Sequence, residues 1–121
     1  MEPRVHRMIR LMTKDLRRQV SLDELAQSLN LSASRLRHLF KVATGTSPAR
    51  FLKARRLQKA KELLEKTLLS VKEVMRKAGF KHRSHFVNDF KKAYGLSPSH
   101  YRLQFLQDKQ KGVEEVQERL M

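Results

Sequence analysis

Apolar residues recur along most of the chain at intervals of three and four positions, which is the spacing of one face of an α-helix. The pattern begins in residues 3–17, where the opposite face is basic. Pro3 suits the first turn of such a helix, because a first-turn residue needs no amide hydrogen bond. The segments that follow show the same spacing, and the pattern therefore predicts an all-α chain. The first apolar stripe is Val5, Met8, Ile9, Met12 and Leu16.

Two short helices joined by a tight turn are predicted next. Ser21 followed by Glu24 has the spacing of a capping box. Asn30 tolerates the positive φ with which helices end, and Ser32 can cap the next helix, which Gly45 ends. Such a pair of helices predicts a helix-turn-helix. Its expected buried positions are Leu22, Leu25, Ala26, Leu29, Leu36, Leu39, Phe40 and Ala43.

A longer, strongly basic helix is predicted from Pro48 to about Lys66, with Ser47 as its cap. No glycine or proline interrupts its interior, so we expect a rigid strut rather than a flexible linker. Its roughly 18 residues would span about 27 Å. Its apolar positions are Phe51, Leu57, Ala60, Leu63 and Leu64.

The second half of the chain repeats the first. When the sequence is shifted by 50 positions, seven residues coincide in a window of fifteen. Upstream the matching shift is 49, so the second copy has gained one residue within 80–84. An internal repeat of this kind indicates one supersecondary unit used twice. The coinciding pairs are Ser34/Ser84, Phe40/Phe90, Lys41/Lys91, Ala43/Ala93, Gly45/Gly95, Ser47/Ser97 and Pro48/Pro98.

The repeat predicts a second helix-turn-helix and a last helix. Ser70 caps the first of these helices, Gly79 supplies a turn residue at positive φ, and Gly95 ends the second helix. Ser97-Pro98 then opens the last helix. The expected buried positions are Val71, Val74, Met75, Ala78, Phe86, Phe90, Ala93, Tyr101 and Phe105.

The pattern weakens after Gln107, where Gly112 interrupts it. We expect this tail to fray or to pack loosely, because termini are ordered only when other contacts hold them. Packing of the tail on the domain or on a partner stays open. The expected organisation is a first helix-turn-helix subdomain (1–46), a connector helix (47–66), a second helix-turn-helix subdomain (67–107) and a C-terminal tail (108–121).

The net charge of +15, from 27 Lys and Arg against 12 Asp and Glu, bears on function rather than on fold. A folded chain this basic predicts a polyanionic partner, and nucleic acid is favoured over a membrane surface or an acidic protein. No apolar run approaches the roughly 20 residues that span a bilayer. The first residues also lack the apolar core of a signal peptide, so nothing directs export.

Few features favour catalysis or metal binding. The chain has no cysteine, which excludes disulfides, thiol catalysis and cysteine-based zinc sites. His82 and His85 lie three positions apart, but no third ligand is spaced to join them. We therefore expect no enzyme activity, no catalytic residue, no metal and no cofactor.

In a helix-turn-helix the second helix enters the major groove and its outward residues reach the base edges. Arg can bind guanine, Asn can bind adenine and Val can meet a thymine methyl group, while Ser and Lys can contact phosphates. The strut is long enough to hold two such helices near successive major grooves. The outward residues are Ser34, Arg37, His38 and Lys41 in the first copy and Arg83, Ser84, Val87, Asn88 and Lys91 in the second.

Two other interpretations stay open. Any one of these residues can belong to an ordinary solvated helix face, since only some outward residues reach bases. The whole chain can also be a non-specific or architectural nucleic-acid-binding protein, which charge alone would support. The dissimilar outward faces of the two copies favour sequence-specific binding.

These residues make the chain similar to the DNA-binding domain of the AraC/XylS family of bacterial transcription regulators. The similarity covers about residues 5–105. It departs from the family at His85, where an aromatic residue is common, and at Asn88, where Arg is common. The most specific match is Gly79-Phe80, Ser84, Phe86, Phe90-Lys91, Gly95, Ser97-Pro98 and Tyr101-Arg102.

The resemblance implies seven helices with two homeodomain-like helix-turn-helix units, which bind adjacent major-groove segments at promoters. By position, it implies base reading by Ala33, Ser34, Arg37, His38, Arg83, Ser84, Val87 and Asn88. We expect contacts to the DNA backbone from Ser32, Lys41, Ser47, Lys81, His82, Lys91, Ser97 and Arg102.

The resemblance also implies where the protein acts and with what. Double-stranded promoter DNA is the expected partner, with RNA polymerase and an effector-sensing domain as further candidates and with no membrane partner. The expected location is the cytoplasm, at the bacterial nucleoid. A stand-alone regulator and a fragment of a longer one both stay open.

Overall fold

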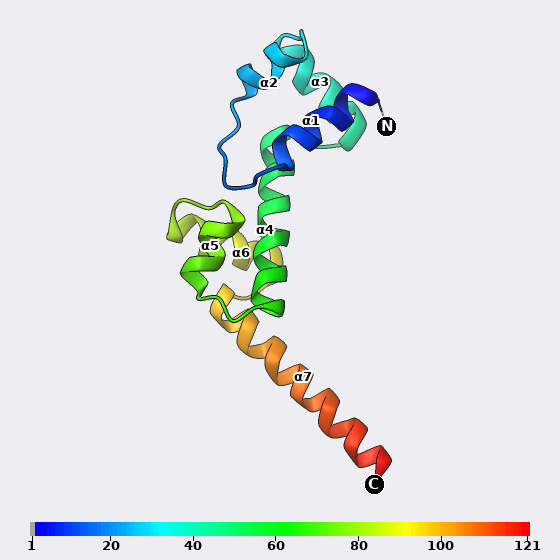
Figure 1. Ribbon diagram of the computed structural model, residues 1–121, viewed down its shortest axis with the longest axis vertical. Helices are drawn as coiled ribbons and strands as arrows, with labels where there is room; N and C mark the ends of the chain where they lie inside the picture. Colours follow the sequence, from blue (N-terminus) through cyan, green and yellow to red (C-terminus); the bar gives the residue numbers. More distant parts are fainter. Residues whose placement is uncertain (1) are drawn as a thin grey trace. The chain divides into compact units, whose positions relative to one another are not determined.

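The computed structural model describes residues 2–121, and over that range it consists of seven α-helices without strands (Figure 1). The all-α expectation and the expected number of helices are therefore confirmed. In chain order the helices are α1 (Pro3–Thr13), α2 (Leu22–Ser28), α3 (Ala33–Thr44), α4 (Pro48–Lys66), α5 (Val71–Ala78), α6 (Arg83–Tyr94) and α7 (Pro98–Leu120).

The helices form two compact units that divide inside α4, one ending at Arg56 and the other beginning at Leu57. The first unit combines α1, α2, α3 and the start of α4. Its core is closed by Phe40, whose ring meets that of Phe51 edge to face with 5.4 Å between centroids. The buried core residues of this unit are Val5, Met8, Met12, Leu25, Ala26, Leu36, Phe40 and Leu52.

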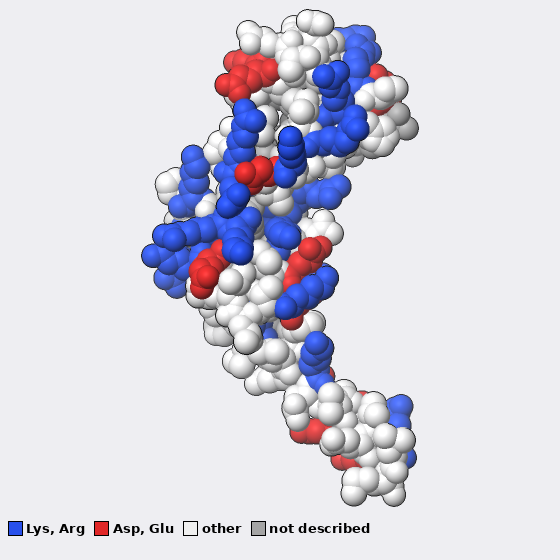
Figure 2. All heavy atoms as spheres, viewed as in Figure 1, with Lys and Arg blue, Asp and Glu red and all other residues white. Residues whose placement is uncertain are grey.

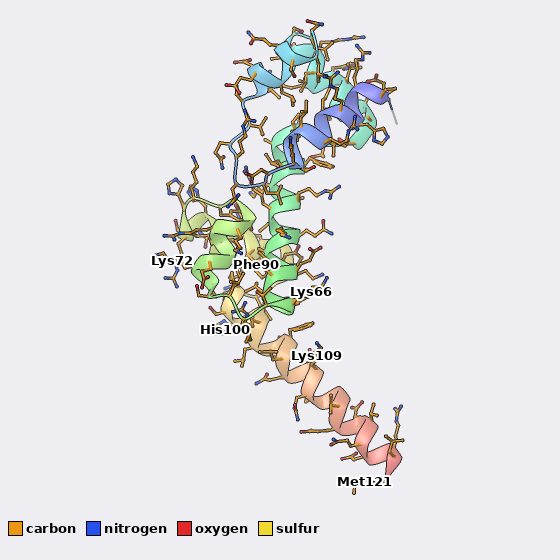
Figure 3. The ribbon with its side chains drawn as sticks, viewed as in Figure 1. Lys66, Lys72, Phe90, His100, Lys109 and Met121 are labelled. Atoms are coloured by element: carbon orange, nitrogen blue, oxygen red, sulfur yellow. The ribbon has the colours of Figure 1, made fainter. Side chains whose placement is uncertain are left out.

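The second unit combines the rest of α4 with α5, α6 and α7. Phe90 lies at its centre, with ring centroids 4.7 Å from Tyr94 and 5.5 Å from Tyr101. Figure 3 shows Phe90 turned into this unit, between its helices. The buried core residues are Leu57, Ala60, Leu64, Val74, Met75, Ala78, Phe86 and Phe90. One helix thus supplies apolar residues to both cores.

The two helix-turn-helix turns differ by a single residue. In the first, Asn30 has φ 56°, and the amide of Leu31 donates to the carbonyl of Ala26 over 2.9 Å. In the second, Gly79 has φ 97°, and Phe80 donates to Met75 over 3.0 Å. These residues correspond by a shift of 49, whereas the helices that follow correspond by 50. The inserted residue therefore lies immediately after Phe80, within the range that the sequence predicts.

The first helix is shorter than its apolar pattern predicts, because it ends at Thr13 rather than near residue 17. The carboxylate of Asp15 accepts a hydrogen bond from the amide of Arg17 over 3.0 Å. Such a local bond gives the backbone an alternative to helix. Leu16 nevertheless packs against the core from this loop.

The last helix is longer than expected, because α7 continues through Gly112 as far as Leu120. The interruption of the apolar pattern at Gly112 therefore does not end the helix, and the tail is helical rather than frayed. Every side chain from Leu106 onward is exposed, so this part of the helix packs against nothing in the described part of the chain.

Candidate nucleic-acid interface

The outward face of α3 is basic and polar, opposite a fully buried apolar face. Leu36 and Phe40 have no exposed surface, whereas Ser34, Arg37 and His38 are exposed. Lys41 is exposed as well, and Ala33 is half-buried at the start of the helix. The buried side fixes the rotation of α3 about its axis, so the predicted contact residues of the first unit share one solvent-facing side.

The residues that begin α3 and α4 are held by serine caps. The Ser32 hydroxyl accepts the amide of Arg35 over 3.1 Å, and the Ser47 hydroxyl accepts that of Arg50 over 3.2 Å. Arg37 and Ser47 also line one pocket of about 240 Å³ in this unit, whose other walls are apolar. The structure therefore brings a predicted base-reading residue and a predicted phosphate-contacting residue close together.

The outward face of α6 is also polar and exposed and lies opposite a buried apolar face, but its side chains differ from those of α3. Phe86 and Phe90 have no exposed surface, while Arg83, Ser84 and Asn88 are exposed. Lys91 is also exposed, but Val87 is half-buried, so only part of its side chain is available to a ligand.

The start of α6 differs from that of α3. His82 stands at the N-cap position and makes no side-chain hydrogen bond to the first turn, whereas Ser32 caps α3. Lys81 and His82 are both exposed, and the ring of His82 meets that of His85 with 5.5 Å between centroids. The first turn of α6 thus presents uncapped amides beside two basic residues, an arrangement that favours an anion.

Arg102 does not lie where we expected it. Its guanidinium donates to the carbonyl oxygens of Leu64 at 3.1 Å, Leu69 at 2.6 Å and Thr67 at 3.4 Å. These bonds direct the charged group into the second unit and use its donors on the loop between α4 and α5. We therefore remove Arg102 from the expected phosphate contacts. Ser97 keeps a capping role, because its hydroxyl accepts the amide of His100 over 3.4 Å.

A second half-buried polar contact supports the same unit. The Tyr101 hydroxyl donates to the carboxylate of Glu65. Burial and this bond raise the pKa of Tyr101 well above the usual range of a phenol. Burial also raises the pKa of Tyr94. The Tyr101–Glu65 pair could not be predicted from local sequence patterns, because its members lie 36 residues apart.

Positive charge is unevenly shared along the chain. Residues 107–121 hold three Lys or Arg and four Asp or Glu, which is a net charge of −1. Because the whole chain has a net charge of +15, residues 1–106 have a net charge of +16. Figure 2 shows Lys and Arg covering much of the visible face over α1–α6, whereas the far part of α7 is mixed. The charge that would attract a polyanion therefore belongs to the two helical units.

The described residues offer little support for other kinds of site. Between residues 2 and 121, no group of three His, Cys, Asp or Glu side chains gathers in a way that would hold a metal ion. Over the same range, no helix combines the length and the apolar character that crossing a membrane requires.

The chain matches a family model described as a helix-turn-helix domain over residues 25–104. Among similar proteins, the transcriptional regulator MtrA of Neisseria gonorrhoeae is 40% identical over 82 residues, which are 68% of this chain and 27% of MtrA. GbdR of Pseudomonas aeruginosa is 33% identical over 97 residues, which are 80% of this chain and 26% of GbdR. The chain thus spans about a quarter of the length of these relatives.

Solved structures show the same fold. The C-terminal domain of AraT, a response regulator from Geobacillus stearothermophilus, has a TM-score of 0.78 and 33% identity, covering 85% of this chain and 86% of that domain. The DNA-binding domain of AdpA, solved with a target DNA, has a TM-score of 0.80 and 26% identity, covering 86% of this chain and 94% of that domain. With the matched helix-turn-helix model and the two-unit arrangement of its helices, the chain belongs to the AraC/XylS family of transcription regulators.

Proposed function

We propose that this chain is a sequence-specific DNA-binding transcription regulator that places α3 and α6 in adjacent major-groove segments of one duplex. The observation that carries the proposal is the contrast between the two copies of the helix-turn-helix. The buried positions are apolar in both copies, with Leu36 and Phe40 in α3 and Phe86 and Phe90 in α6, whereas the outward residues match at some positions and differ at others. Relatives of known function and a structural neighbour solved with DNA support the same conclusion.

The positions that match between the copies suit contacts to the DNA backbone. Lys41 corresponds to Lys91 and Ser34 to Ser84, and all four are exposed. A lysine or serine contact to phosphate carries no sequence information, so both copies can use the same residue. Contacts to the DNA backbone that are the same in both copies would orient α3 and α6 in the same way in their grooves.

The positions that differ suit base reading. Arg37 corresponds to Val87, and His38 corresponds to Asn88. Arg can bind guanine O6 and N7 together, whereas Asn can bind adenine N6 and N7, so the two helices would prefer different base pairs. A single chain would then recognise an asymmetric site without the two-fold symmetry that a dimer imposes.

The expected contacts follow from the geometry of each helix. Base reading is assigned to the exposed Arg37, His38, Arg83 and Asn88, with the half-buried Ala33 and Val87 restricted to close apolar contacts. Ser34 and Ser84, expected from the resemblance to read bases, are reassigned to phosphates because the same residue stands in both copies. Lys41, Lys81, His82 and Lys91 are assigned to phosphates. The capping serines Ser32, Ser47 and Ser97 would present the first turns of α3, α4 and α7.

The proposal extends to the partners of a regulator. Double-stranded promoter DNA is the direct partner, and RNA polymerase is a partner at the promoter. An effector-sensing domain, on the same polypeptide or on another, is the proposed source of a signal, because the relatives are about four times longer than the matched region. The proposed site of action is the bacterial cytoplasm, at the nucleoid.

Selection of bound sites from a random DNA pool, followed by competition at one fixed salt concentration, tests the proposal. A regulator of this kind should prefer its selected site to bulk DNA by about 10³-fold or more. The selected site should be asymmetric, with two contacted segments about one helical turn apart. A preference near one would contradict sequence-specific binding and leave an architectural role.

A further inference from the structure

Residues 103–121 of α7 carry a stripe of exposed apolar side chains that belong to neither described core. Leu103, Leu106, Val113 and Val116 are each about half exposed, and Leu120 is 82% exposed. They continue a helix that protrudes from the second unit, and Figure 3 marks this segment with Lys109 and Met121. An isolated helix of this length is marginal in water, because most helical stability in proteins comes from packing an apolar face.

Leu106, Val113 and Leu120 recur at the seven-residue interval of a coiled coil. If Leu106 occupies the position called d, then Val113 and Leu120 are also d, and Leu103, Gln110 and Gln117 are the a positions. Positions a and d face the partner helix in such a pair. From Asp108 onward the outer positions b, c and f hold only glycine or charged residues, which are Asp108, Lys111, Gly112, Glu115, Glu118 and Arg119, whereas Gln104 and Phe105 occupy b and c nearer the second unit.

The flanking positions complement those of an identical helix. In a parallel pair, each g residue faces the e residue five positions later on the partner helix. Lys109 at g would then face Glu114, and Val116 at g would face Met121. One flanking pair thus joins opposite charges and the other joins two apolar side chains.

The present contacts of these charges are weak and exposed. The ammonium group of Lys109 lies 5.6 Å from the centre of the Phe105 ring, and the Glu114 carboxylate accepts the Gln110 side chain over 3.4 Å. Both can be exchanged for contacts to a second helix at little cost.

We propose that residues 103–121 of α7 form a parallel two-stranded coiled coil with the same segment of a second copy of this chain. The occupant is a second copy because the a, d, e and g residues complement themselves. The net charge of −1 in residues 107–121 lets two such segments approach without strong repulsion, and it disfavours DNA on this face. None of the proposed DNA contacts lies in this segment, so pairing leaves both reading helices free.

The association is expected to be weak. The paired segment has fewer than three heptads, and glutamine at two a positions specifies register at a cost in stability. The buried area falls below that of a standard stable interface. We expect monomers and dimers to coexist at protein concentrations of about 10–500 µM, a range typical of weak interfaces.

Sedimentation equilibrium of the 121-residue chain with Val113→Glu and Gly112→Glu tests this pairing. Both variants add one negative charge at neighbouring positions, but only Val113 faces the partner. Val113→Glu should weaken dimerisation at least tenfold, whereas Gly112→Glu should leave it equal or stronger. Unchanged thermal melting of the two units shows that each variant is folded. A wild type that stays monomeric up to about 1 mM, or a Val113→Glu variant that dimerises normally, overturns the proposal.

Charge exchange between Lys109 and Glu114 tests orientation and partner together. Lys109→Glu alone and Glu114→Lys alone should each weaken self-association, because each places like charges opposite one another. A mixture of the two variants should form heterodimers, in which every such pair is attractive. If the single variants dimerise as well as the wild type, or if the mixture gains nothing, the parallel register is wrong and the pairing proposal fails.

Discussion

The guanidinium of Arg102 donates a hydrogen bond of 2.6 Å to the main-chain carbonyl oxygen of Leu69. Arg56 acts in the same way in the first unit, where it donates to the carbonyls of Leu16 at 3.0 Å and Arg18 at 3.1 Å. Each arginine holds the loop that leads into a helix-turn-helix. Burial lowers the pKa of Arg56, but an arginine remains charged at any ordinary pH.

Replacing Arg102 by alanine should destabilise the second unit by about 2–3 kcal/mol, because bonds to a charged donor are lost and three carbonyls lose a partner. Lysine should restore little, since its single ammonium cannot match the forked geometry. Urea unfolding measures the loss, and DNA affinity measured where the variant is folded should be close to wild type. A variant of normal stability with weakened DNA binding would instead restore the phosphate contact that the sequence suggested for Arg102.

The helices could be predicted from the sequence because their signals are local. Apolar spacing, a capping serine and a glycine or asparagine at each turn lie within a few residues of one another. The repeat alone also placed the inserted residue within 80–84. The role of Arg102 could not be predicted in this way. Its three acceptors are main-chain carbonyls, which have no residue-specific signature, and they lie 33 to 38 residues away.

Two local expectations failed for a related reason. Ala93 was expected to be buried like the large apolar residues of α6, yet it is exposed. Alanine fits either face of a helix, so its identity says little about burial. The interruption of the apolar pattern at Gly112 was also uninformative, because a glycine inside a helix costs only about 1 kcal/mol relative to alanine and α7 continues through it.

Tyr101→Phe should destabilise the second unit by about 1–3 kcal/mol near neutral pH, because the bond to the Glu65 carboxylate is lost. The pKa of Tyr101 is raised on folding, so this contribution is complete below the pKa of an unfolded tyrosine, about 10. Above that pH the unfolded chain gains an ionised phenol, and the advantage of the wild type over Tyr101→Phe should shrink. Urea unfolding of both proteins from pH 7 to pH 11 tests the trend, and a constant difference would contradict it.

Arg37→Ala should weaken binding to the selected DNA by about 1–3 kcal/mol and relax the preference at one base pair. Lys91→Ala should weaken binding evenly across sequences and reduce the slope of log affinity against log salt by about 1. Fluorescence anisotropy with the selected site and its single-base variants separates the two effects.

Lys111→Ala provides the control for these two variants, because it removes one exposed positive charge from the far part of α7. It should leave both affinity and base preference unchanged. The assignment of reading faces is wrong if Arg37→Ala and Lys91→Ala lower affinity equally for every base variant.

The residues at the two turns should respond oppositely to substitution. Gly79 has φ 97°, where a side chain costs about 1–2 kcal/mol, so Gly79→Ala should destabilise the second unit by that amount. Asn30 has φ 56°, and Asn30→Gly should stabilise the first unit by about 0.5 kcal/mol, since the relief of strain slightly exceeds the added chain entropy.

Gly112→Ala is the matched control for Gly79→Ala. A Cβ atom at Gly112 meets nothing within 4 Å, and the residue lies inside α7. The alanine should therefore raise helix content and stability by about 0.5–1 kcal/mol, because it lowers the entropy lost on helix formation. Circular dichroism melting distinguishes the variants. The change in stability should be negative for Gly79→Ala, because Gly79 has left-handed turn geometry, and positive for Gly112→Ala. If both substitutions stabilise the protein, the backbone at Gly79 tolerates a side chain, and the second turn does not depend on glycine.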